Sequence, residues 1–144
     1  MDDQAVAWLL EGDPAVRWQV ERDILDAGEE TWPATRKRCE DEGFVRRLLD
    51  RQDADGTWGA GLYSPKWTST TYSLLLLRRL GLAPGNEQAL RGCRTLLDRA
   101  RWLDSGLTYW KTHTYAEKCV NGMVLSVGAY FGLSDPRLDR IAES

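Results

Sequence analysis

Apolar residues recur at intervals of three and four along most of the chain, which is the spacing of one face of an α-helix. An N-capping side chain or an early proline marks the predicted helix starts, and a glycine marks the predicted ends. These signals stand at Asp13-Pro14, Asn86, Asp135-Pro136, Gly81 and Gly132. No strand-like alternation competes with this pattern, so the sequence predicts an all-α fold.

Two kinds of helix alternate in this pattern. Residues 33–52 form a charged segment with a narrow apolar stripe, as on an outer helix, and the leucine-rich segment that follows at 68–82 is apolar on most sides. The same order, with an aromatic loop between the two helices, returns over residues 86–133 and predicts a repeat of helical hairpins. We therefore expect one domain over residues 1–144, with N-terminal helices at 1–31, a first hairpin at 32–85, and a second hairpin with the start of a further helix at 86–144.

The loop of the first hairpin carries a motif formed by Gln52, Gly56 and Trp58. The carboxamide of Gln52 can bond to the backbone groups that lack partners at the end of a neighbouring helix. Gly56 permits a tight turn that brings the Trp58 indole back over that amide, where it excludes water. An amide and an indole are neither acids nor bases, so we expect a structural clamp rather than a catalytic site.

Together with Gly43, Phe44, Leu48 and Leu49 before it, this motif resembles the QW motif of the squalene and terpenoid cyclases. The same helical-hairpin repeat occurs in protein prenyltransferase β-subunits, and the chain resembles an N-terminal portion of a small bacterial squalene-cyclase-like protein. The resemblance implies an α/α toroid, in which outer helices surround inner helices that line an apolar cavity. It also implies binding of a hydrophobic isoprenoid-type ligand and, in a catalytic member, its cyclisation or transfer. The alternative is a non-catalytic helical-repeat scaffold that binds a protein or a lipid-like partner.

The resemblance places candidate substrate-binding residues in and after the two aromatic loops, near one rim of the expected cavity. Aromatic faces attract carbocations, and a polar cluster follows the second loop. The candidates are Trp67, Tyr72, Tyr109, Trp110, His113, Glu117 and Cys119. Ordinary core packing is the alternative interpretation of the aromatic members.

Two small groups of residues have the types and spacing of metal ligands. Asp53 and Asp55 are spaced as a carboxylate pair for magnesium, and Glu117 and Cys119 with His113 resemble part of a prenyltransferase zinc site. The carboxylate pair lies in an ordinary turn sequence, and the second group offers only three ligands. The sequence also lacks the acidic DxDD motif with which squalene cyclases protonate their substrate. We therefore expect no metal and no cofactor, and the sequence identifies no catalytic residue.

Charge and cysteine content limit the partners. A net charge of -3 and a pI near 5.2 provide no basic face for nucleic acid. The chain has no apolar run long enough to cross a membrane, its acidic start is not a signal peptide, and its three cysteines are scattered. We expect a cytoplasmic protein with no integral membrane segment and a hydrophobic small molecule as its partner.

The number of predicted hairpins is too small to close a toroid. A repeat array that stops on an apolar helix leaves that helix face uncovered. We therefore expect a half toroid that either belongs to a longer protein or associates with itself or with a subunit that completes the ring. A compact bundle that folds back on itself is the remaining alternative.

Overall fold

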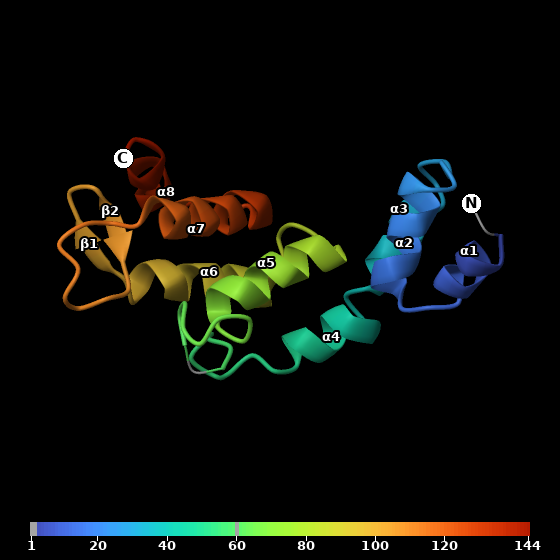
Figure 1. The fold of residues 1–144 in the computed structure, drawn as a ribbon, viewed down its shortest axis with the longest axis horizontal. Helices are drawn as coiled ribbons and strands as arrows, with labels where there is room; N and C mark the ends of the chain where they lie inside the picture. The colour runs from blue at the N-terminus through green and yellow to red at the C-terminus, as the bar shows by residue number, and fades with distance from the viewer. Residues whose placement is uncertain (1–2, 60) are drawn as a thin grey trace. The chain divides into compact units, whose positions relative to one another are not determined.

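The computed structural model describes residues 3–59 and 61–144 (Figure 1). These residues form eight α-helices and one two-stranded antiparallel sheet, so the prediction of a mainly helical chain is confirmed. The chain divides into two compact units: unit 1 comprises Met1–Asp50 and Arg79–Ala83, and unit 2 comprises Arg51–Arg78 and Pro84–Ser144. The predicted boundaries between the N-terminal helices and the two hairpins, at residues 31 and 85, stay predictions. Residues 1 and 2 of the predicted N-terminal segment lie outside the described residues.

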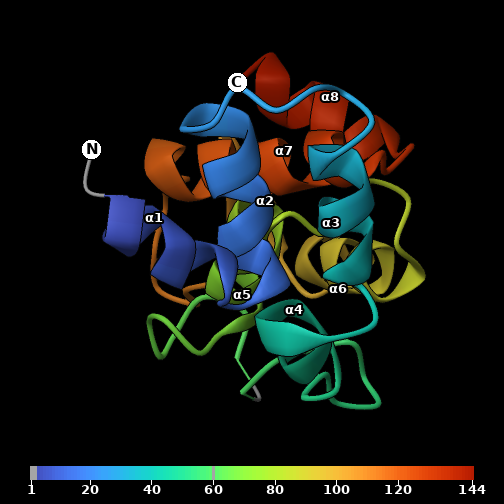
Figure 2. The same ribbon diagram turned by 90° about the vertical axis from the view of Figure 1, so that its right-hand side faces the viewer.

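Unit 1 is built around its second helix. Its helices are α1 (Asp3–Leu10), α2 (Pro14–Asp23), α3 (Trp32–Arg38) and α4 (Gly43–Leu49), and α2 packs against the other three. Figure 2 shows α2 between α1 and α3. The predicted start of α2 is confirmed, because Asp13 caps it by accepting a hydrogen bond from the backbone N–H of Ala15 at 3.0 Å. In the core of this unit the Trp18 indole donates to the Leu80 carbonyl at 3.0 Å.

The prediction of one outer helix over residues 33–52 is wrong, because α3 and α4 are separate helices there. Gly43 opens α4 with a φ of +73°, a conformation that side-chain-bearing residues rarely adopt. A Cβ atom at this position would lie 2.5 Å from a carboxylate oxygen of Asp13, which also accepts a hydrogen bond from the Phe44 N–H at 2.7 Å. The apolar periodicity runs through this break, but the backbone turns at the glycine.

Unit 2 contains the remaining elements: most of α5 (Thr70–Leu80), then α6 (Glu87–Asp98), β1 (Arg101–Leu103), β2 (Gly106–Thr108), α7 (Lys118–Phe131) and α8 (Pro136–Ala142). Helix α7 packs against α6, α8 and β2. The predicted caps are confirmed, since Asn86 and Asp135 each accept backbone hydrogen bonds at a helix start and Gly132 ends α7 at a φ of +78°. No described helix is both long and apolar enough to cross a membrane.

The sheet corrects the all-α prediction. Strands β1 and β2 pair with Trp102 opposite Leu107. On the other edge of β2, the Asn121 side chain accepts from the Leu107 N–H and donates to the Leu107 carbonyl, both at 2.8 Å. A buried carboxamide thus satisfies the backbone groups that a third strand would otherwise pair. Strands of three residues are too short to produce a recognisable alternation in the sequence.

Candidate functional site: an aromatic belt

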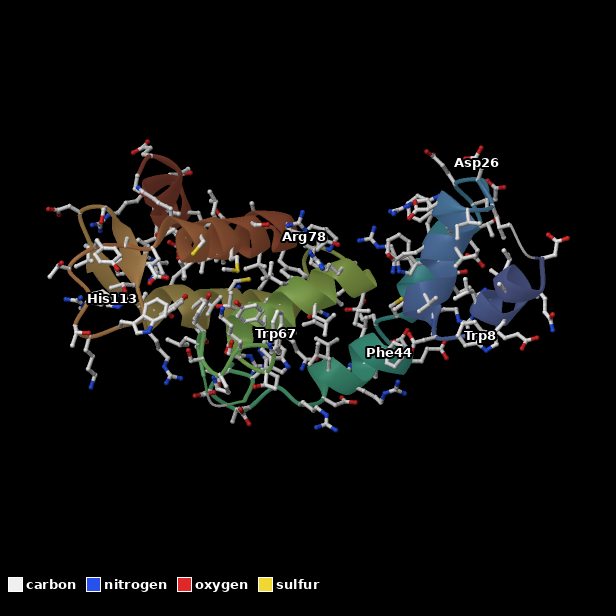
Figure 3. The ribbon with its side chains drawn as sticks, viewed as in Figure 1. Trp8, Asp26, Phe44, Trp67, Arg78 and His113 are labelled. Atoms are coloured by element: carbon white, nitrogen blue, oxygen red, sulfur yellow. The ribbon has the colours of Figure 1, made fainter. Side chains whose placement is uncertain are left out.

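Six rings of unit 2 contact one another in an unbroken row, which we call the aromatic belt. Its members in spatial order are Trp67, Tyr72, Tyr63, Trp110, His113 and Tyr115. The successive ring centroids lie 5.1, 5.5, 5.3, 5.0 and 5.3 Å apart. The contact between Tyr63 and Trp110 joins the loop that precedes α5 to the loop that precedes α7. Figure 3 labels one member from each loop, Trp67 and His113.

The first loop is fastened to the start of α5 by two threonine side chains. The hydroxyls of Thr70 and Thr71 donate to the carbonyls of Gly61 and Leu62, both at 2.7 Å. The backbone N–H groups of the same threonines donate to the same carbonyls. Trp67 lies in the turn of this loop with a φ of +73°, so the fold holds this residue in a conformation that a tryptophan rarely adopts.

The second loop is fastened to the sheet. The Arg101 guanidinium donates to the carbonyl of Trp110 at 3.3 Å and to the carbonyl of His113. At the end of the loop, the Ala116 N–H donates to the Ser105 hydroxyl at 3.2 Å. The short sheet, which the sequence did not predict, therefore positions half of the belt.

The two halves of the belt differ in ring geometry. Trp110, His113 and Tyr115 are stacked with interplanar angles of 18° and 14°, so their planes are nearly parallel. The contacts from Trp67 through Tyr72 and Tyr63 to Trp110 are tilted by 50° to 64°. Solvent reaches the two ends most, because Trp67 is 77% exposed and Tyr115 is 59% exposed. The belt therefore presents apolar ring surface at both ends.

A pair of phenols provides the polar group at the middle of the belt. The hydroxyls of Tyr63 and Tyr72 form a hydrogen bond of 3.2 Å. This hydrogen bond, together with desolvation and the nearby Glu117 and Cys119, raises the pKa of Tyr63 to about 12. Tyr63 is consequently neutral at physiological pH, where it can exchange hydrogen bonds but carries no charge.

A second polar group lies beside the stacked rings. The Nδ1 atom of His113 is 3.6 Å from a carboxylate oxygen of Glu117, which is too long for a hydrogen bond. The two side chains form an ion pair when the imidazole is protonated. Cys119 is an exposed free thiol in the first turn of α7. Among residues 3–59 and 61–144, no group of three or more His, Cys, Asp or Glu side chains could hold a metal ion.

The structure brings most of the predicted substrate-binding residues together. Trp67, Tyr72, Trp110 and His113 are belt members, and Glu117 lies beside His113. The remaining aromatic candidate lies elsewhere.

Tyr109 is largely buried, and its hydroxyl donates to the Leu96 carbonyl at 3.2 Å. Burial raises the pKa of this phenol, which is therefore a packing residue outside the belt. Tyr63 and Tyr115 are belt members that the prediction missed. Tyr63 shares a loop with Trp67, and Tyr115 follows His113 by two positions, so their sequence neighbours were the available signal.

The residues of the predicted clamp lie beside the belt loops and contact α6. The Gln52 side-chain NH₂ donates to the Gly56 carbonyl at 3.0 Å and to the Gln88 carbonyl, in the first turn of α6, at 2.8 Å. Trp58 is 2% exposed, and its ring lies 2.8 Å from the point that a Cβ atom on Gly92 of α6 would occupy. The carboxamide and the indole thus both fasten this loop to α6.

The carboxylates of the predicted turn have partners within the chain. Asp55 accepts hydrogen bonds from the N–H and the hydroxyl of Thr57 at 3.0 and 2.7 Å, and it pairs with Arg99 at 2.9 Å. The bonds from Thr57 and the charge of Arg99 lower the pKa of Asp55. Asp53 accepts a long hydrogen bond of 3.5 Å from the same threonine hydroxyl. These contacts give both carboxylates a role in shaping the turn.

Comparisons with known proteins assign no family to this chain. No protein-family model, no curated protein and no solved structure matches it.

Proposed function

We propose that the chain is an α/α-toroid-like domain of the terpenoid cyclase and prenyltransferase type, in the form of a half toroid, and that the aromatic belt binds an isoprenoid-type ligand. The observation that carries this proposal is the unbroken contact of six rings, five from two loops and Tyr72 from the start of α5. These loops precede α5 and α7, which are the apolar helices of the two proposed hairpins. In a toroid such loops lie at one rim, so their contact through Tyr63 and Trp110 supports a common binding edge.

The belt suits a long hydrocarbon better than a compact polar ligand. Its rings follow one another at intervals of 5.0 to 5.5 Å, and an extended chain can contact several of them at once. The exposed ends, Trp67 and Tyr115, offer the most unburied surface to a ligand, since an aromatic side chain can bury roughly 150–250 Å² in all, at about 25 cal/mol per Å² of apolar area. The phenol pair of Tyr63 and Tyr72 would bond to a hydroxyl group of the ligand. We propose binding as the role of these residues and assign a catalytic role to none of them.

A direct test is the binding of a fluorescent farnesol analogue, followed by anisotropy, to the unmodified chain and to two tryptophan variants. Trp67→Ala removes the more exposed of the two ends of the belt and should weaken binding by roughly 10- to 100-fold, as expected for losing the burial of one large apolar side chain. Trp8→Ala is the matched control, because Trp8 is 72% exposed but lies on α1 of unit 1. Equal affinities for all three proteins, or equal losses in the two variants, would contradict the proposal.

A groove in unit 1 supports the second candidate, a non-catalytic scaffold. It is open, has a volume of about 410 Å³, and is lined by Trp8, Leu9, Val16 and Phe44 on its apolar side. Both aromatic side chains are exposed, at 72% and 47%. A protein partner or a second copy of the chain would cover this apolar surface. Under this candidate, Trp8→Ala and not Trp67→Ala abolishes partner binding or self-association, as measured by light scattering.

A further inference from the structure

Cationic side chains accompany the aromatic belt. The chain has four lysines, and three of them are sequence neighbours of belt residues or of Glu117: Lys66 precedes Trp67, Lys111 follows Trp110, and Lys118 follows Glu117. All three are exposed. Lys118 donates to the backbone carbonyl of Ser144, whereas no described carboxylate forms an ion pair with Lys66 or Lys111. Two exposed lysines without a described carboxylate partner are thus direct sequence neighbours of Trp67, at one end of the belt, and of Trp110, in its middle.

Exposed tryptophan and tyrosine side chains next to lysines are typical of protein surfaces that bind at the interface between a bilayer and water. The amphipathic rings of Trp and Tyr partition to the level of the lipid headgroups. Lysines next to an anionic leaflet gain electrostatic attraction, while their alkyl stems lie along apolar surface. The hydrogen bonds from Thr70 and Thr71 fix the loop that carries Trp67, so this indole is presented to solvent by a defined turn.

The charges favour one occupant over others. An uncharged protein surface or a zwitterionic bilayer would use the rings without requiring Lys66 and Lys111, whereas an anionic bilayer uses both. Stacking of nucleic-acid bases needs free ring faces, but His113 is already stacked against both Trp110 and Tyr115.

We propose that the exposed side of the aromatic belt, with Lys66 and Lys111, docks on anionic lipid bilayers. This inference rests on the proposed function in one respect: if the belt binds an isoprenoid-type ligand, the bilayer is the source of that ligand. The docking is peripheral: Trp67 enters the headgroup region and the two lysines remain among the lipid phosphates.

The test is co-flotation of the full chain with vesicles of phosphatidylcholine alone or mixed with phosphatidylserine. We expect binding to the mixed vesicles that falls as salt is added, since the attraction is screened. Lys66→Gln and Lys111→Gln should each weaken it about fivefold, and the double variant about 30-fold, as expected when each lysine contributes about 1 kcal/mol. Lys37→Gln is the matched control, because Lys37 is the fourth lysine, is exposed, and lies on α3 of unit 1.

Equal binding to both kinds of vesicle, or no effect of the double variant, would overturn the inference. So would the absence of vesicle binding while farnesol analogue still binds, and in that case the proposed function stands. Conversely, lysine-dependent vesicle binding without farnesol binding would support the docking surface and refute the proposed ligand. The double lysine variant should bind farnesol analogue in solution as the unmodified chain does, while Trp67→Ala should lose both activities.

Discussion

The most informative substitution for the fold is Asn121→Leu, because it removes a buried amide without shortening the side chain. Asn121 is 3% exposed, and Leu107, whose backbone it bonds, is fully buried. Its side chain accepts from the Leu107 N–H and donates to the carbonyls of Leu107 and Glu117, at 2.8, 2.8 and 3.0 Å. Leucine can make none of these bonds, so the Leu107 N–H and carbonyl would remain buried without their partner.

The expected loss follows from those two orphaned groups. A buried polar group left without a hydrogen bond costs about 1–3 kcal/mol, so two groups give about 2–6 kcal/mol. The added apolar burial of leucine offsets roughly 1 kcal/mol. We therefore expect the free energy of unfolding to fall by about 1–5 kcal/mol, with the damage centred on β2.

Urea denaturation followed by far-ultraviolet circular dichroism measures the loss, and hydrogen exchange at the Leu107 amide locates it. Gly122→Ala, on the same helix, is a control whose effect on the free energy of unfolding should have the opposite sign, because a Cβ atom there meets nothing within 4 Å. It should raise stability by about 0.5–1 kcal/mol. A loss below about 0.5 kcal/mol for Asn121→Leu, with the Leu107 amide still protected, would refute the reasoning.

Two further predictions concern ionisation. Hydrogen bonds from Arg137 lower the pKa of Asp135, so the native carboxylate stabilises the fold fully above about pH 4 and loses that effect as the pH falls through its lower native pKa. Asp135→Asn should lower the free energy of unfolding by roughly 0.5–1 kcal/mol at pH 7 and by less as the pH falls below 4, and a loss that does not change with pH would contradict this. Burial raises the pKa of Cys39 to about 11 and of Cys93 to about 12, whereas Cys119 is exposed. A thiol reagent at pH 8 should therefore label the Cys119 thiol rapidly in the native chain, and it should label no thiol rapidly in Cys119→Ser. Equal labelling rates for the three thiols would contradict this prediction.

Local signals in the sequence were sufficient to locate the helix boundaries that depend on one side chain. Asp13, Asn86 and Asp135 each accept a backbone hydrogen bond where a helix was expected to start. Gly81 and Gly132 follow the ends of α5 and α7 with positive φ values. Capping is a contact between residues two or three positions apart, so it can be predicted without knowledge of the tertiary structure.

Features that depend on distant residues could not be predicted in this way. The start of α4 depends on the hydrogen bond from the Phe44 N–H to Asp13, and the sheet depends on Asn121, which follows Leu107 by an entire loop. The belt is a similar case. The sequence indicated Trp67 and Trp110 separately, but Tyr63 becomes a site residue only because its ring lies between Tyr72 and Trp110.

The contact between Tyr63 and Trp110 also has a consequence for how the belt forms. Neither loop alone contains the row of rings, so a synthetic peptide copied from either one would lack it. The surface exists only while α5, α6 and the sheet hold both loops in place. A molecule that binds the belt should therefore raise the melting temperature of unit 2 by mass action. Above saturation of the belt, the stabilisation grows with the logarithm of the concentration of that molecule.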